Sequence, residues 1–133
     1  MRTLVSLAAL AALVLTLHTA ARAADDDDTP AAAKTRKLLK SKISVDFKDT
    51  RLEDAMDEIK TEVKGFKFLL DAKGGVSRNQ TITYKAENKT VEVILDEMLT
   101  KPDLGYIVIS KKGNAYDGLV QVRKGKERGT EKK

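Results

Sequence analysis

Apolar and polar residues along the chain follow two different periods, and the switches between them predict the elements of secondary structure. Alternation of apolar and polar residues is typical of strands with one buried face. Apolar residues spaced by three or four positions are typical of amphipathic helices. These patterns predict strands at 43–47, 66–70, 80–85, 106–110 and 119–123, and helices at 52–63 and 91–99. The expected order is β-α-β-β-α-β-β.

The helix ends carry recognisable signals. Thr50 and Glu53 have the spacing of a capping box, which predicts the start of the first helix. Gly65 is placed to end that helix. The second helix needs a polar cap, which we expect from Asn88 or Thr90.

The two halves of this pattern match each other with a shift of 39 residues. The helix that starts at Leu52 aligns with the helix that starts at Val91, and each carries two adjacent acids at the same place. A single strand–helix–strand unit cannot bury its apolar faces alone. We therefore expect a pseudo-repeated βαβ unit that folds as one small two-layer α+β domain over residues 38–123.

Residues 1–23 have the pattern of a secretory signal peptide. Arg2 supplies the positive start, residues 4–17 are almost entirely apolar, and Ala21-Arg22-Ala23 fits a small-x-small cleavage site. The apolar run is shorter than the roughly 20 residues that span a bilayer as a helix. We therefore expect an exported protein, periplasmic or secreted, with no transmembrane segment after cleavage.

The segments on either side of the domain are polar or of low complexity. Residues 24–37 contain four consecutive aspartates at 25–28 and three alanines at 31–33, so we expect a disordered acidic and alanine-rich leader. A loose divalent-cation site at the aspartates is the alternative. Residues 124–133 are expected to form a basic flexible tail, with contact to anionic lipid or a polyanion as the alternative.

Composition removes many kinds of chemistry. The 133 residues include no Cys and no Trp, and the one histidine, His18, lies in the signal segment. After cleavage the chain has neither histidine nor cysteine, so no Ser-His-Asp triad, Cys-His pair or histidine–cysteine zinc site can form. No cofactor is expected. Cleavage also removes Arg2 and Arg22, which lowers the net charge from +5 to +3. This weak excess, interleaved with acids, argues against nucleic acid as a partner.

The remaining chemical candidates are weak. Two acid pairs, Asp57 with Glu58 and Asp96 with Glu97, have the adjacency of an acid–base couple, but both lie opposite the apolar helix stripes. A Ser–Lys nucleophile stays open in principle. Asn79 and Asn88 begin N-x-T sequons, so glycosylation also stays open. We expect no catalytic, cofactor or metal site, and hence no enzyme.

The last predicted strand offers a backbone site. A short final strand would lie at a sheet edge, where unpaired N–H and C=O groups accept an incoming strand. The candidate partner-binding residues of this edge are Leu119, Val120, Gln121, Val122 and Arg123.

Several segments together resemble the secretin/TonB short N-terminal domain. They read Ile-Ser-Val-Asp-Phe-Lys-Asp-Thr-Arg-Leu-Glu-Asp-Ala over 43–55 and Gly-Phe-Lys-Phe-Leu-Leu-Asp over 65–71. The match continues at 81–84, 88–91, 95–99 and 104–109. The resemblance implies two helices packed between small sheets. It also implies a periplasmic module that docks inner-membrane or regulatory proteins near a secretin or TonB-dependent receptor, here as a free-standing copy.

These observations favour a non-enzymatic envelope protein that acts as a protein–protein interaction module. The expected partner is a secretin, a TonB-dependent receptor or a regulatory protein of the envelope. The alternative function is a binding module for the cell wall or another anionic polymer, because lysines are scattered along the chain and the tail is basic.

Overall fold

The structure is a computed structural model that describes residues 28–130. Within this range the chain forms helices and strands in an order that extends the predicted one at both ends. The elements are α1 (Pro30–Leu38), β1 (Lys42–Arg51), α2 (Leu52–Glu62), β2 (Phe68–Leu70), β3 (Thr81–Thr90), α3 (Val91–Thr100), β4 (Leu104–Val108), β5 (Val120–Lys124) and β6 (Arg128–Gly129). The α+β class and the order of the seven predicted elements are confirmed. The signal segment and most of the aspartate run lie outside the described residues.

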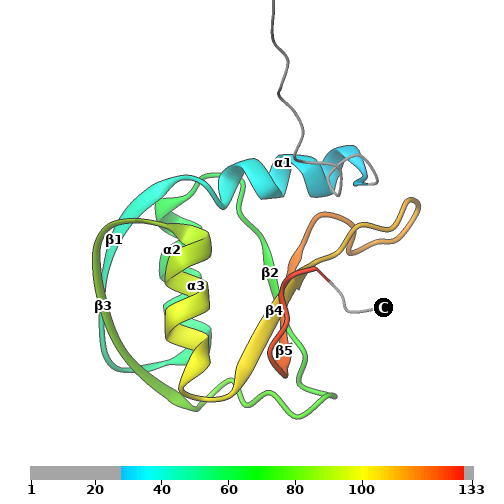
Figure 1. Cartoon of the computed structure of the whole chain (residues 1–133). Helices are drawn as coiled ribbons and strands as arrows, with labels where there is room; N and C mark the ends of the chain where they lie inside the picture. Colours follow the sequence, from blue (N-terminus) through cyan, green and yellow to red (C-terminus); the bar gives the residue numbers. More distant parts are fainter. Residues whose placement is uncertain (1–27, 131–133) are drawn as a thin grey trace, which may run out of the picture.

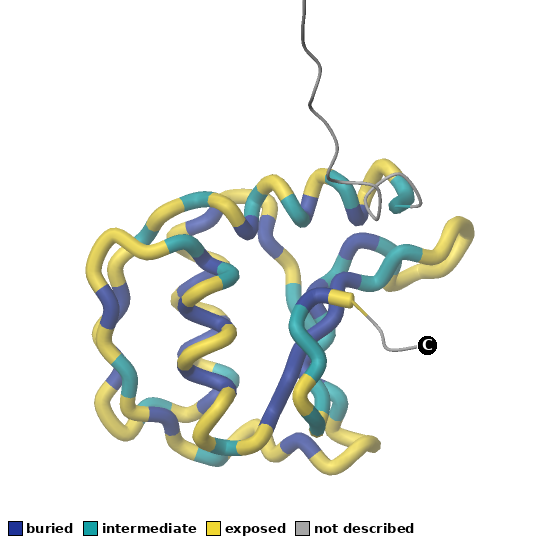
Figure 2. The backbone as a smooth tube through the Cα atoms, viewed as in Figure 1, coloured by how far each residue is buried: buried dark blue, intermediate teal, exposed yellow. Residues whose placement is uncertain are grey.

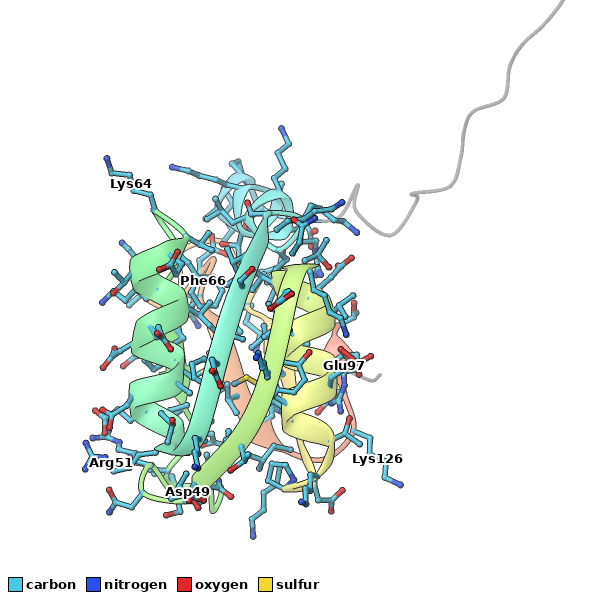
Figure 3. The ribbon with its side chains drawn as sticks, turned by 90° about the vertical axis from the view of Figure 1, so that its left-hand side faces the viewer. Asp49, Arg51, Lys64, Phe66, Glu97 and Lys126 are labelled. Atoms are coloured by element: carbon cyan, nitrogen blue, oxygen red, sulfur yellow. The ribbon has the colours of Figure 1, made fainter. Side chains whose placement is uncertain are left out.

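The strands divide into two sheets with α2 and α3 between them (Figure 1). β1 and β3 form an antiparallel two-stranded sheet, and the other sheet has the order β2-β5-β4-β6. Viewed from the side of the smaller sheet, β1 and β3 lie in front of the two helices (Figure 3). The domain therefore has three layers, where the sequence predicted two, because β1 and β3 pair only with each other.

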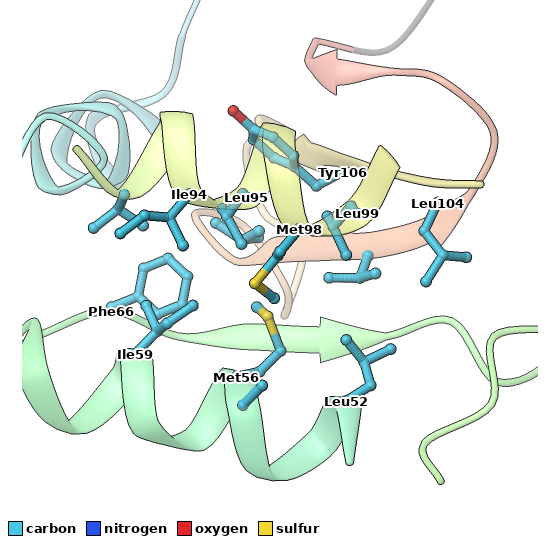
Figure 4. Close-up of a cluster of buried hydrophobic side chains, with 14 of the residues drawn as sticks. Leu52, Met56, Ile59, Phe66, Ile94, Leu95, Met98, Leu99, Leu104 and Tyr106 are labelled. Atoms are coloured by element: carbon cyan, nitrogen blue, oxygen red, sulfur yellow. The ribbon is translucent and has the colours of Figure 1, made fainter. Parts of the chain in front are cut away.

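The core surrounds the inner faces of α2 and α3 and includes buried side chains of both sheets. The buried faces of α2 and α3 meet there, with Met56 and Met98 pointing toward one another (Figure 4). Figure 2 shows the same division along the backbone, with buried positions on the inner faces. The largest fully buried side chains are Phe47, Leu52, Met56, Ile59, Phe66, Val91, Ile94, Leu95, Leu99, Val120 and Val122.

The expected repeat is present in hydrogen bonds as well as in sequence. Asp49 and Asn88 both have positive φ angles, 47° and 52°. The backbone N–H of Asp49 donates to Oγ1 of Thr83 (3.1 Å), and that of Asn88 donates to Oγ of Ser44 (3.0 Å). Each pair of equivalent residues is again 39 positions apart. The two βαβ units are thus related by a pseudo-twofold arrangement.

The helix starts follow the same symmetry, and one capping prediction is wrong. The N–H groups of Leu52 and Glu53 donate to the carbonyls of Gln80 and Arg78, and the equivalent groups of α3 donate to those of Ser41 and Leu39. The predicted capping box at α2 does not form. Thr50 still belongs to β1, and its hydroxyl binds the backbone of Lys48 instead. α3 is capped by Thr90, whose Oγ1 accepts from the N–H of Val93 (3.4 Å).

Gly65 does not itself end α2. The helix stops at Glu62, with extended backbone at Val63, and Gly65 occupies the turn that follows, at φ 91°. Glycine adopts this left-handed conformation without the steric penalty that other residues carry. The position therefore serves the turn into β2 rather than the helix cap.

The prediction that residues 24–37 form a disordered leader is wrong for the described part of this segment. Residues 28–37 are not disordered, because α1 begins there and lies across one end of the larger sheet (Figure 1). Oγ1 of Thr29 caps the helix by accepting from the N–H of Ala32 (3.1 Å), and Pro30 occupies the first helical position. Ala32 and Leu39 join the hydrophobic core, which holds this segment in place.

The prediction that residues 124–133 form a flexible tail is also wrong for the described part of this segment. Lys124 ends β5, and β6 pairs parallel with β4. The N–H of Tyr106 donates to the carbonyl of Glu127 (3.0 Å). The guanidinium of Arg128 binds the carboxylate of Asp96 and the carbonyl of Leu104. These contacts fix the chain after β5 against the sheet.

Candidate interaction surfaces

β5 lies in the interior of its sheet, so the predicted edge at residues 119–123 is absent. It pairs with β2 on one side and with β4 on the other. Val120 donates its N–H to the carbonyl of Lys67 (3.0 Å), and the N–H of Asp71 donates to the carbonyl of Val122 (2.9 Å). The backbone of Leu119, Val120, Gln121, Val122 and Arg123 therefore cannot receive an incoming strand as predicted. The prediction failed because it placed the last predicted strand at the edge of its sheet, whereas the chain continues into β6 and β5 lies between β2 and β4.

Within the described residues, the strands with one unpaired edge are β1, β3, β2 and β6. The two longest, β1 and β3, carry the positive-φ irregularities at Asp49 and Asn88 and exposed charges such as Lys48 and Lys85. Bulges and charges of this kind impede pairing with another strand. Strand addition is thus disfavoured along the smaller sheet.

The two acid pairs do not form acid–base couples. Asp57 and Glu58 are exposed on α2. On α3 the neighbouring acids bind opposite sides of the domain: Asp96 forms an ion pair with Arg128 of β6, and Glu97 binds Tyr84 and Lys89 of β3. The carboxylates therefore support the packing of α3 between the two sheets.

The contacts of Glu97 shift two pKa values. The Tyr84 hydroxyl donates to Oε1 of Glu97 (2.7 Å), and Nζ of Lys89 donates to the same oxygen (3.0 Å). These hydrogen bonds hold the pKa of Glu97 below its ordinary value. Desolvation, and then the neighbouring carboxylate, raise the pKa of Tyr84. Each shift favours the form that makes the contact, an ionised Glu97 and a protonated Tyr84.

The other chemical candidates are accounted for by local structure. Oγ of Ser110 accepts from the N–H of Thr29 (2.9 Å), and Oγ of Ser44 accepts from that of Asn88. The sequon residues Asn79 and Asn88 are exposed. Residues 28–130 contain no cluster of three or more acidic, histidine or cysteine side chains that could hold a metal ion.

The projecting loop between β4 and β5 is a feature that sequence analysis did not single out as a candidate surface. We call residues 110–118 the hairpin tip; Figure 1 shows it extending beyond the sheet beside α1. Tyr116 lies in it and is 52% exposed, whereas the other large apolar side chain exposed in the described chain, Val93, is 39% exposed. The signal was available, because Tyr116 lies among glycine, asparagine and lysine rather than in an alternating strand pattern.

Thr29, which caps α1, and Thr35, which lies within α1, both bind the hairpin tip. Oδ1 of Asp117 accepts from Oγ1 of Thr29 (2.6 Å) and from the N–H of Lys111 (3.1 Å). Oγ1 of Thr35 donates to the carbonyl of Gly118. Gly118 approaches α1 so closely that an added Cβ would lie 2.8 Å from Cβ of Ala31. α1 thus serves as the support of the hairpin tip.

Comparisons with known proteins found no match to this chain among family models, curated proteins or solved structures. Among the described residues, none of the helices has both the length and the apolar character needed to cross a membrane.

Proposed function

We propose that this protein is a non-enzymatic, exported protein–protein interaction module of the secretin/TonB short N-terminal type. The observation that supports the proposal is the placement of α2 and α3 between two small sheets, each helix belonging to one copy of a repeated βαβ unit. This is the arrangement that the resemblance in sequence implies. The signal-like residues 1–23 support an envelope or extracellular location.

The composition of the surface agrees with a binding role. The helices and sheets bury their apolar side chains in a single core, and the charged side chains lie outside it. A body of this size, roughly 100 residues, has room for one modest core and offers its outer faces to partners. Function in such a module comes from surface complementarity rather than from a deep site.

Crosslinking in cells tests this proposal. The full chain with a C-terminal tag is expressed in its native host, crosslinked, and purified from the envelope fraction under denaturing conditions. The expected result is one recurrent envelope protein, joined through peptide-to-peptide crosslinks that mass spectrometry locates on the folded domain. The control is the same signal peptide fused to the tag alone.

The alternative function makes a different prediction in the same experiment. A cell-wall or anionic-polymer binder would yield polymer fragments that glycan-degrading enzymes release, and its binding would weaken steeply with salt. Recovery of polymer alone, or of the same proteins as the tag control, would overturn the proposed function.

A further inference from the structure

The hairpin tip combines exposed side chains with a hydrogen-bonded backbone. Its residues from Lys111 to Tyr116 are exposed, as Figure 2 shows along the projecting loop. Nevertheless, its backbone forms consecutive turns. The N–H of Asn114 donates to the carbonyl of Lys111, and the N–H of Asp117 donates to that of Asn114 (3.1 Å each). Oδ1 of Asn114 also accepts from the N–H of Tyr116 (2.7 Å).

The contacts with α1 make this conformation independent of a ligand. Thr29 binds both Ser110 and Asp117, so the two sides of the hairpin tip are joined through one residue. A loop that is already ordered loses less conformational entropy on binding than a flexible one. Tyrosine adds a large apolar contact area with few rotatable bonds, and it is enriched at the positions that dominate binding energy.

The exposed charged side chains of the hairpin tip are both lysines. Lys111 and Lys112 are exposed, and neither has an ion-pair partner among residues 28–130. The acid of the hairpin tip, Asp117, is turned toward Thr29 and the backbone of Lys111. The exposed side chains that a partner can contact are therefore the phenol ring of Tyr116 and the ammonium groups of Lys111 and Lys112, which precede it by five and four residues.

We propose that the hairpin tip is the docking surface of this module, and that it binds an acidic segment of a partner protein. Tyr116 enters an apolar pocket of the partner, while Lys111 and Lys112 contact carboxylates at the rim of that pocket. This inference rests on the proposed function, because it names the surface through which the interaction module acts. Charge complementarity selects an acidic segment.

The test uses a photo-crosslinking amino acid placed at single positions of the full chain in cells. Ala115, beside Tyr116, is the test position. Lys126 is the matched control position, because it is also exposed but lies at the opposite end of the domain, the end at which Figure 3 also shows Asp49. The proposal predicts an acidic-segment crosslink from position 115 and at least about tenfold less capture from position 126.

Three sets of variants then test the chemistry. With the probe at position 115, Tyr116→Ala and the charge reversal Lys111→Glu/Lys112→Glu should each lower capture at least about tenfold. Lys111→Arg/Lys112→Arg should retain it. The control Lys101→Glu/Lys126→Glu makes the same change in net charge at the opposite end and should leave capture unchanged. Thermal unfolding of each purified variant checks that the fold is intact.

The outcomes separate this inference from the proposed function. If a protein is captured elsewhere on the domain but not at position 115, the hairpin tip is not the docking surface, although the proposed function is retained. Equal capture by the charge-reversed variant would lead to the same conclusion. Capture of an anionic polymer at position 115 that is lost on charge reversal would contradict the claim that the hairpin tip binds a protein. No specific capture at any position of the folded chain would overturn both.

Discussion

Tyr106 illustrates how its surroundings change the chemistry of one side chain. The residue is only 4% exposed and lies against α3 and β6. Burial, followed by the nearby carboxylates of Glu92 and Asp96, raises its pKa to about 12. Neutral tyrosine is thus favoured in the folded state, which connects the titration of this hydroxyl to stability.

The pH dependence of unfolding should show this connection. In the unfolded chain the Tyr106 hydroxyl ionises near its ordinary pKa of about 10, whereas the folded chain keeps the proton up to a pKa of about 12. Between these values the unfolded state binds fewer protons, so stability falls as pH rises, by about 1.4 kcal/mol per pH unit. Below about pH 9 this group contributes almost no slope, because it is protonated in both states.

Urea unfolding of the wild type and Tyr106→Phe at several alkaline pH values measures the effect. Because other groups of the chain also change charge in alkaline solution, the difference between the two proteins is the relevant quantity. The variant should lose less stability than the wild type above pH 10. Parallel pH profiles would show that the Tyr106 hydroxyl is not responsible.

The two predicted helix caps provide a second comparison between residues. Thr90→Ala removes the hydroxyl that caps α3 and should lower the free energy of unfolding by about 1 kcal/mol. Thr50→Ala should cost less, because the Thr50 hydroxyl binds the backbone of Lys48 and makes no cap hydrogen bond to α2. Chemical denaturation of both variants checks the ranking. Equal losses would contradict the distinction between a capped and an uncapped helix.

At the level of elements, the interior position of β5 sets the effect of proline. Val120 is fully buried and donates its N–H to Lys67. Val120→Pro removes that donor in the middle of a sheet and should destabilise the domain by about 3 kcal/mol or more. Val120→Ala is the matched control, since it keeps the N–H and shortens the side chain. Circular dichroism and denaturant unfolding should find the proline variant clearly less stable.

Periodicity predicted most elements because their buried faces are local patterns. The stripe of α2 and the alternation in β1 follow directly from residues such as Leu52, Ile59 and Phe47, all of which are buried. The partners of each strand were not predictable in this way. β2 is far from β5 in sequence, β6 pairs with β4 on the side away from β5, and this choice of neighbours depends on how the whole chain packs.

α1 was missed even though its start signals are present. Thr29 before Pro30 is a standard helix start, with a capping hydroxyl and a proline at the first position. The adjacent aspartates and alanines favoured a disordered interpretation because few of the residues are apolar. What stabilises α1 is tertiary contact through Ala32, Thr35 and Leu39, which a local reading of the sequence does not reveal.

For the whole molecule, α1 should be part of the folding unit. A chain that begins at Leu39 keeps the carbonyls that cap α3 but loses α1 and its contacts with the hairpin tip. Loss of the buried Ala32 and of several hydrogen bonds predicts a decrease in stability of about 2–4 kcal/mol. A chain that begins at Asp28 is the control and should unfold at the same temperature as one that begins at Ala24. Calorimetry of the three chains measures this, and equal melting temperatures would show that α1 is dispensable.

Arg36 holds the first and last described segments of the chain together. Its guanidinium binds the carboxylate of Asp28 and donates to the carbonyl of Gly129 (3.1 Å). The start and the end of the folded domain are therefore no farther apart than one side chain can reach. A short glycine–serine linker should join residue 130 to residue 28, and new termini could open at the exposed Gly74-Gly75 turn. We therefore expect a circularly permuted chain, which has the same elements in a different order, to keep the packing of the domain.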